Sequence, residues 1–120
     1  MSFDDENKVF TITTPSKNTA IFSDKDSQIT IQDQNENSIV MSDSGITIKS
    51  PKDITVEATQ NLILKGDEGV TIESSAGDVE ISGMNVKVNA DTQYSVNGGE
   101  IAQINSSAEL TLNSGMIMIN

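Results

Sequence analysis

The chain has 120 residues, a formal net charge of −11, no histidine and no cysteine. Seven basic residues against 18 acidic ones argue against nucleic acid as a partner, because such binding depends on cations that neutralise phosphates. The lack of cysteine excludes disulfides and thiol chemistry, and 35% hydrophobic with 3% aromatic residues is a thin supply for a conventional globular core.

Residues 1–45 are predicted to form an irregular collar of β-hairpins that leads into the rest of the chain. Short apolar stretches at 9–12, 20–22, 29–31 and 39–41 are typical of strands, and turn-forming residues separate them. The separator Asp33–Asn37 superficially resembles a calcium loop, but Ser38 and Ser44 stand where such a loop needs Gly and Glu. A hairpin turn is therefore favoured there, and no metal site is predicted.

Residues 46–114 repeat an eight-residue unit nine times. Each unit, here called an octad, has apolar residues at its first and third positions and Gly, Ala or Ser at its fifth. A fixed period of this kind indicates a repeat architecture, and small fifth residues suit a corner of the chain. One nine-residue step followed by one seven-residue step interrupts the period, which we interpret as a local bulge near Gly77. The octads begin at Ile46, Ile54, Leu62, Val70, Val79, Val86, Tyr94, Ala102 and Leu110.

The octads are predicted to be short strands that present their apolar pairs on one face, because strand side chains alternate with a period of two. Two architectures remain open: a single-chain solenoid with three octads per coil, and three chains wound around one axis as a triangular prism. We favour the trimer, since a solenoid of so few coils buries little and each buried Val, Ile or Leu contributes roughly 1.5–3 kcal/mol. The sequence thus predicts an all-β, intertwined homotrimeric triple-stranded β-helix. Its predicted core comprises Ile46, Ile48, Ile54, Val56, Leu62, Leu64, Val70, Ile72, Val79, Ile81, Val86, Val88, Tyr94, Val96, Ile104, Leu110 and Leu112.

The octads and the stretches Asn18–Asp24, Ile29–Asn35 and Ile39–Ile48 resemble the C-terminal spike of the valine-glycine repeat proteins (VgrG) of type VI secretion systems. They are also similar to the central tail spikes of contractile-tailed phages, and the resemblance spans essentially residues 3–120. It implies an intertwined homotrimer that leads a sheathed tube through a target membrane, with upstream hub and tube proteins and a PAAR-type tip protein at its blunt end. Some spikes of this broader class hold iron through histidine pairs. This chain has no histidine, so no cofactor is expected.

The last six residues, 115–120, differ from the octads because both faces of their strand are apolar. Continuing the alternation of the preceding strand places Met116 and Met118 inward and the two isoleucines on the other face. Three copies would gather an apolar patch that soluble proteins seldom leave uncovered. The alternative is a tapering prism in which both faces become internal. The predicted docking platform for a tip protein comprises Met116, Ile117, Met118, Ile119 and Asn120.

The function predicted from these features is a non-enzymatic, membrane-puncturing spike. The sequence contains neither a histidine nor a Gly-x-Ser-x-Gly motif, so it gives no support for a serine nucleophile. The N-terminus lacks the apolar segment of a signal peptide, so we expect assembly in the bacterial cytoplasm and delivery by the contractile apparatus. The alternative is a monomeric β-solenoid that serves as an adhesin or surface-binding module. Its outward threonine series is interrupted by Glu80, Lys87, Ser95 and Gln103, which argues against a flat repetitive ligand.

Overall fold

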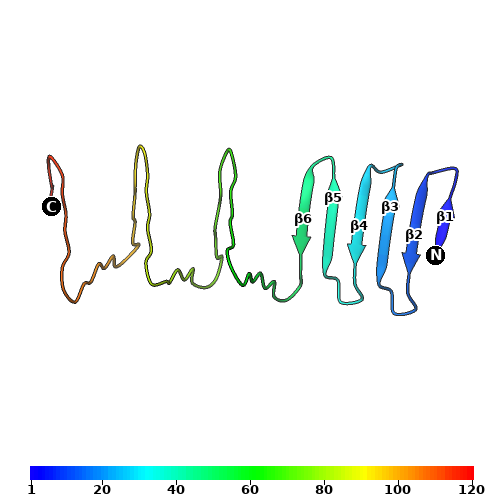
Figure 1. Cartoon of the computed structure of the whole chain (residues 1–120), viewed down its shortest axis with the longest axis horizontal. Helices are drawn as coiled ribbons and strands as arrows, with labels where there is room; N and C mark the ends of the chain where they lie inside the picture. Colours follow the sequence, from blue (N-terminus) through cyan, green and yellow to red (C-terminus); the bar gives the residue numbers. More distant parts are fainter. The chain divides into compact units, whose positions relative to one another are not determined.

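A computed structural model describes residues 1–120, and the chain is all-β, as predicted. It divides into two units, Met1–Asp67 and Glu68–Asn120. The first contains one six-stranded antiparallel sheet in the order β1-β2-β3-β4-β5-β6 (Figure 1). No helix is present that could cross a membrane. The strands are β1 Ser2–Asp4, β2 Val9–Thr13, β3 Thr19–Ser23, β4 Gln28–Gln32, β5 Ser38–Ser42 and β6 Gly45–Lys49.

The four strands expected in the collar are confirmed as β2 to β5, and two further strands flank them. Strand β1 was not expected; it pairs with β2 and places Phe3 opposite Phe10. Strand β6 contains the first apolar pair of the octads, Ile46 and Ile48, yet it still pairs antiparallel with β5. The sheet therefore continues into the first octad, and the domain boundary expected after residue 45 stays a prediction.

Four of the five turns between strands need a left-handed backbone at a non-glycine residue. The φ angles are 54° at Lys8, 67° at Lys17, 50° at Ser27 and 68° at Glu36. In three of these turns the amide of that residue donates to the carbonyl three positions earlier, for example Glu36 N–H to Asp33 O at 3.2 Å. The last turn is different: Ser42 pairs with Gly45, whose φ of 115° favours glycine. All five turns reverse the chain and so produce antiparallel neighbours.

The register of the sheet gathers apolar side chains on one face, as alternation with period two requires. The opposite face is mostly polar, and one of its residues, Ser23, is the only buried residue of the chain, at 6% exposure. Phe10 and Phe22 lie across the β2–β3 pair with ring centroids 6.1 Å apart. The apolar face has two rows: Phe3, Phe10, Phe22, Ile29, Met41 and Ile46 in one, and Ile12, Ala20, Ile31, Ile39 and Ile48 in the other.

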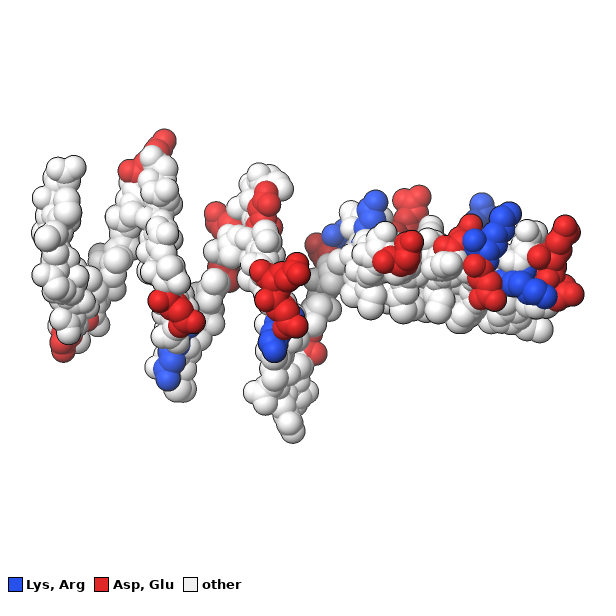
Figure 2. Space-filling model, turned by 90° about the horizontal axis from the view of Figure 1, so that it is seen from above, with Lys and Arg blue, Asp and Glu red and all other residues white.

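No second layer of the chain covers this apolar face. The chain has no buried hydrophobic residue, and Phe3, Phe22 and Ile31 keep 61%, 44% and 47% of their surface exposed. Figure 2 shows charged side chains along one margin of the sheet and an opposite margin of the sheet without them. A sheet with one bare apolar face is unstable alone in water and requires a partner layer.

Candidate assembly surface

Beyond β6 the chain consists of extended segments joined by bends, and the bends follow the octad period. They lie at 51–52, 59–60, 67–68, 75–77, 84, 91–92, 99–100, 107–108 and 115, each directly after a fifth octad position. The expected corners are therefore present at every octad. The bend at 75–77 is one residue longer than its neighbours and the bend at 84 is shorter. These two bends absorb the nine-residue and seven-residue steps and keep the apolar pairs in phase.

Serine at the fifth position has a role that its size alone does not predict. The Ser50 Oγ accepts the amide of Lys52 at 3.1 Å, and the Ser106 Oγ accepts the amide of Glu109 at 3.1 Å. Ser74 and Ser114 accept amides two or three residues onward in the same way. Such hydroxyl-to-backbone bonds imitate a backbone turn. Each octad serine at this position thus holds its own corner and satisfies an amide that the bend would leave unpaired.

Glycine at the fifth position matters most at residue 98. A Cβ added to Gly98 would collide with the carbonyl oxygen of Ile101. A Cβ added to the neighbouring Gly99 would meet nothing within 4 Å. The corner at 98–101 therefore folds the chain tightly over the fifth residue, which explains the need for the smallest residue there.

The apolar pairs of the octads lie open to solvent in the single chain. Between Ile54 and Leu112, the residues of the predicted core keep 52% of their surface exposed at Val79 and up to 73% at Ile81. The chain brings none of them into a buried cluster. Their role as a trimer core stays a prediction. Burial of side chains this exposed has to come from outside the chain.

After β6, the backbone of the octads is equally without partners. Every backbone-to-backbone hydrogen bond outside the strands lies between residues 8 and 37, within the turns of the sheet. Figure 1 draws the segments after β6 as a thin trace without strand arrows. Extended backbone whose N–H and C=O groups are to be buried must pair with another strand. A monomeric solenoid would provide that strand one coil away, and the chain makes no such pair.

The C-terminal segment offers a second register beside the expected alternation. Ile117 is 53% exposed, like the first apolar residues Val79 and Leu110 at 52% and 53%, whereas Met116 and Met118 are 74% and 83% exposed. Gly115 is a single-residue bend, like residue 84. After the bend at residue 84, the next octad begins at Val86, three residues after the fifth position Gly83, and Ile117 follows Ser114 by the same three residues. By this spacing Ile117, rather than Met116, would continue the inward positions of the octads, and the placement of the docking residues stays a prediction.

The acidic turns form local hydrogen bonds in place of clusters suited to a cation. The Asp33 carboxylate accepts the Asn37 side-chain amide at 2.9 Å and the backbone amides of Asn35 and Asn37 at 2.8 and 2.9 Å. These hydrogen bonds lower the pKa of Asp33, and the bond from the Asn37 side chain has the largest effect. The predicted hairpin turn at Asp33–Asn37 is confirmed. A similar bond from the Asn7 side chain to Asp4 lowers the pKa of Asp4.

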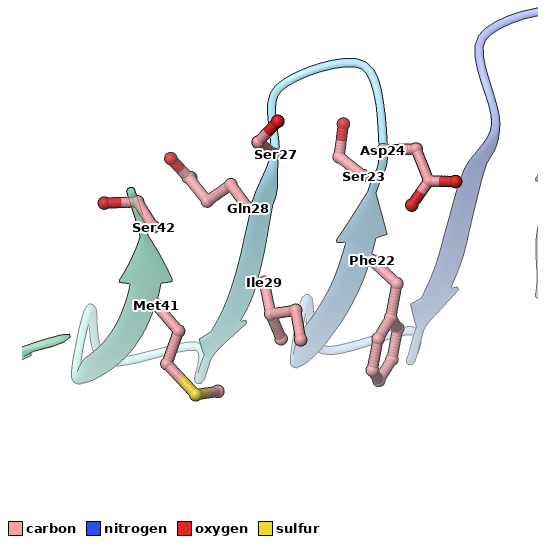
Figure 3. Close-up of a pocket in the computed structure, with 8 residues that line it drawn as sticks. All are labelled: Phe22, Ser23, Asp24, Ser27, Gln28, Ile29, Met41 and Ser42. Carbon is pink, nitrogen blue, oxygen red and sulfur yellow. The ribbon is translucent and has the colours of Figure 1, made fainter. Parts of the chain in front are cut away.

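A shallow hollow of about 380 Å³ lies beside β3, β4 and β5. Figure 3 shows Phe22, Ile29 and Met41 pointing to the same side of the sheet. Asp24 is the one ionisable residue that lines the hollow, so no pair of catalytic groups is assembled there. Phe22, Ile29 and Met41 belong to the bare apolar face, whereas Ser23 and Gln28 lie on the opposite face, so the hollow is not confined to the apolar face. Its lining comprises Phe22, Ser23, Asp24, Ser27, Gln28, Ile29, Met41 and Ser42.

The part of the chain that joins the sheet to the octads matches the model of a known family. Residues 9–60 match the family model of the phage baseplate V C-terminal trimerisation domain. This match confirms the resemblance to the spike region of phage baseplate proteins and supports a homotrimer with a structural, phage-tail-like role. It runs from β2 to the bend after the second octad strand, so it includes the bare apolar face and the first exposed pairs. No curated protein matches the chain at a significant level.

Proposed function

We propose that this chain forms the needle of a trimeric, non-enzymatic spike that punctures membranes for a contractile injection apparatus of the type VI secretion kind. The observation that carries the proposal is the octad region itself, in which regularly spaced apolar pairs and an unpaired extended backbone both lack a partner within the chain. Three identical chains would supply both. The match to a baseplate trimerisation domain supports that number of chains.

The mechanism is mechanical. Three interwound chains share one apolar column, so no chain can peel away without exposing the pairs of all three. Backbone hydrogen bonds between chains then run along the axis and resist compression when the apparatus contracts. The acidic surface and polar outward positions keep the needle from being retained in a bilayer, where charged side chains are costly. Hub and tube proteins would hold its base during assembly in the cytoplasm, before delivery out of the cell.

The C-terminal end would carry a PAAR-type tip protein. Met116, Met118 and Ile119 are 74%, 83% and 94% exposed, and three copies at the end of a prism would form one apolar surface. Methionine side chains are flexible and adapt to a partner that lacks threefold symmetry.

The first experiment is the absolute mass in solution by light scattering. One chain weighs 12.8 kDa, so a trimer has a mass near 38 kDa, three times that value. A mass near three chains across a wide range of concentrations supports the spike. A single-chain mass at all concentrations contradicts it, because an exposed octad region would then be the native state.

The tip assignment needs a separate test with a PAAR-type protein as the probe. Met116→Ser with Met118→Ser should reduce tip binding at least tenfold and leave the trimer mass unchanged, because the spacing after Gly115 favours an outward position for both residues. Thr111→Ser, on the outward face of the preceding strand, is the matched control and should bind normally. Full tip binding by the methionine variant would refute the docking role.

A further inference from the structure

Charged residues of the octads alternate in sign along two runs, one at the fourth octad position and one at the second. The fourth position is Lys49, Glu57, Lys65 and Glu73 in four successive octads. The second position carries Glu80 and then Lys87 in the two octads that follow. All six side chains belong to exposed residues. Only Lys65 has an ion-pair partner within the chain, Asp67 at 3.6 Å, and both of these side chains are more than 80% exposed.

Strand β6 offers a free edge next to the first of these charges. It is the last strand of the sheet, and only its side toward β5 is paired. All five of its residues are exposed. An unpaired edge of this kind accepts a further strand through its backbone.

The winding of a threefold prism fixes which strand can reach that edge. If a chain moves to the next face at each corner, its second octad lies on the face where a neighbouring chain has its first. Three chains fill each level, so one octad corresponds to a rise of one strand spacing, about 4.8 Å. Neighbouring chains on a face are then parallel and offset by one octad. Offsets of zero, two or three octads arise where one chain slips along the axis during assembly.

The charge pattern distinguishes these offsets. An offset of one octad places Lys49 beside Glu57, Glu57 beside Lys65, Lys65 beside Glu73 and Glu80 beside Lys87, four contacts of opposite sign. An offset of two places lysine on lysine and glutamate on glutamate. An offset of zero places each charge beside its own copy. An offset of three retains one favourable contact, between Lys49 and Glu73.

We propose that these alternating charges select the one-octad offset between neighbouring copies, with β6 pairing in parallel with residues 54–58 of a second copy and Lys49 beside its Glu57. The inference rests on the proposed trimer and adds its register. Each exposed ion pair contributes little to stability. In the registers offset by zero or two octads, however, like charges would face one another in all three chains and destabilise the assembly. The apolar pairs alone cannot make this choice, because they repeat in every octad.

Disulfide trapping tests the register directly, and the chain has no cysteine to interfere. In parallel neighbours the Cα atoms of residues 49 and 57 would lie about 5 Å apart, within the range that a disulfide bridges. Under mild oxidation, Lys49→Cys with Glu57→Cys should yield covalent trimers on a non-reducing gel. Lys49→Cys with Lys65→Cys is the matched control and should yield few. Trimers from the control or from Lys49→Cys with Glu73→Cys, and none from the first variant, would overturn the proposal.

Light scattering of the unoxidised cysteine variants separates this inference from the proposed function. A trimeric mass without the expected cross-link refutes the register alone, whereas a single-chain mass refutes both. A second readout is charge reversal: Glu57→Lys places three lysines in one column and should lower the melting temperature, more so at low salt. Glu68→Lys makes the same charge change beside uncharged Gln60 and Ala76 and should have a smaller effect. Equal effects would contradict the proposal.

Discussion

The extended segment Leu62–Leu64 offers a sharp test of the assembly, because it has an apolar residue on each face. In the single chain Ile63 and Leu64 are similarly exposed, at 83% and 72%. A monomer therefore predicts similar small effects when either is shortened to alanine. A trimeric prism predicts a large difference, since only Leu64 lies at an inward position.

The magnitude follows from three copies of each change. Leu→Ala in a packed core costs about 2–5 kcal/mol, so Leu64→Ala should cost about 6–15 kcal/mol per trimer. Ile63→Ala removes an outward side chain and should cost about 1 kcal/mol or less per chain, mainly through lower strand preference.

The assay is denaturant unfolding at several protein concentrations, with the mass of each variant measured by light scattering. Leu64→Ala should lower the transition midpoint and make dissociation visible at low concentration, because folding and assembly are linked by mass action. Ile63→Ala should shift the midpoint much less than Leu64→Ala and leave the trimer mass unchanged. Equal midpoints for both variants would refute the placement of octad pairs in a shared core.

Two smaller perturbations test local features. Gly98→Ala should destabilise the chain by about 1–3 kcal/mol per copy through overpacking against the Ile101 carbonyl, whereas Gly99→Ala should be tolerated, and thermal unfolding of the pair decides this. The Asp33 carboxyl should titrate below its ordinary pKa of 3.8 in an NMR pH series, and Asn37→Ala should raise that pKa toward the ordinary value. Because the folded-state pKa is lowered, the stabilisation is present above the unfolded-state pKa and lost as pH falls through the folded value; an unshifted midpoint contradicts the turn geometry.

Much of the fold was predictable because its signals are local. Alternation marked the strands around Ile21 and Ile29, and small fifth residues marked every corner. Strand β1 escaped prediction because Phe3 is one apolar residue in an acidic stretch, and its pairing with Phe10 depends on register across a turn. The hydroxyl bonds at the corners were missed because size alone explained serine there. The second register at Ile117 depends on the single-residue bend before it, which counting alternate residues does not detect.

The first octad shows why a repeat sequence does not by itself determine its partner. Ile46 and Ile48 have the same pattern as later pairs, yet their strand pairs within the chain. The difference lies in what precedes it. A two-residue turn ending at Gly45 reverses the chain onto β5, whereas each later bend redirects the chain without returning it alongside the previous strand. The corner after Lys49 includes Pro51, which has no amide to extend the sheet.

The same corner divides pairing within a chain from pairing between chains. Up to Lys49 the backbone forms its hydrogen bonds within local hairpins. Because their loops are short, these hairpins form quickly and at a low cost in entropy. After Lys49, the backbone N–H and C=O groups need hydrogen-bond partners from other copies of the chain. Bringing those copies together from solution costs entropy. A sheet with a bare apolar face can gather three copies first and so hold three octad tails at high effective concentration. Alternating charges at Lys49, Glu57 and Lys65 then act on tails already side by side, which is where weak, register-selective contacts are sufficient.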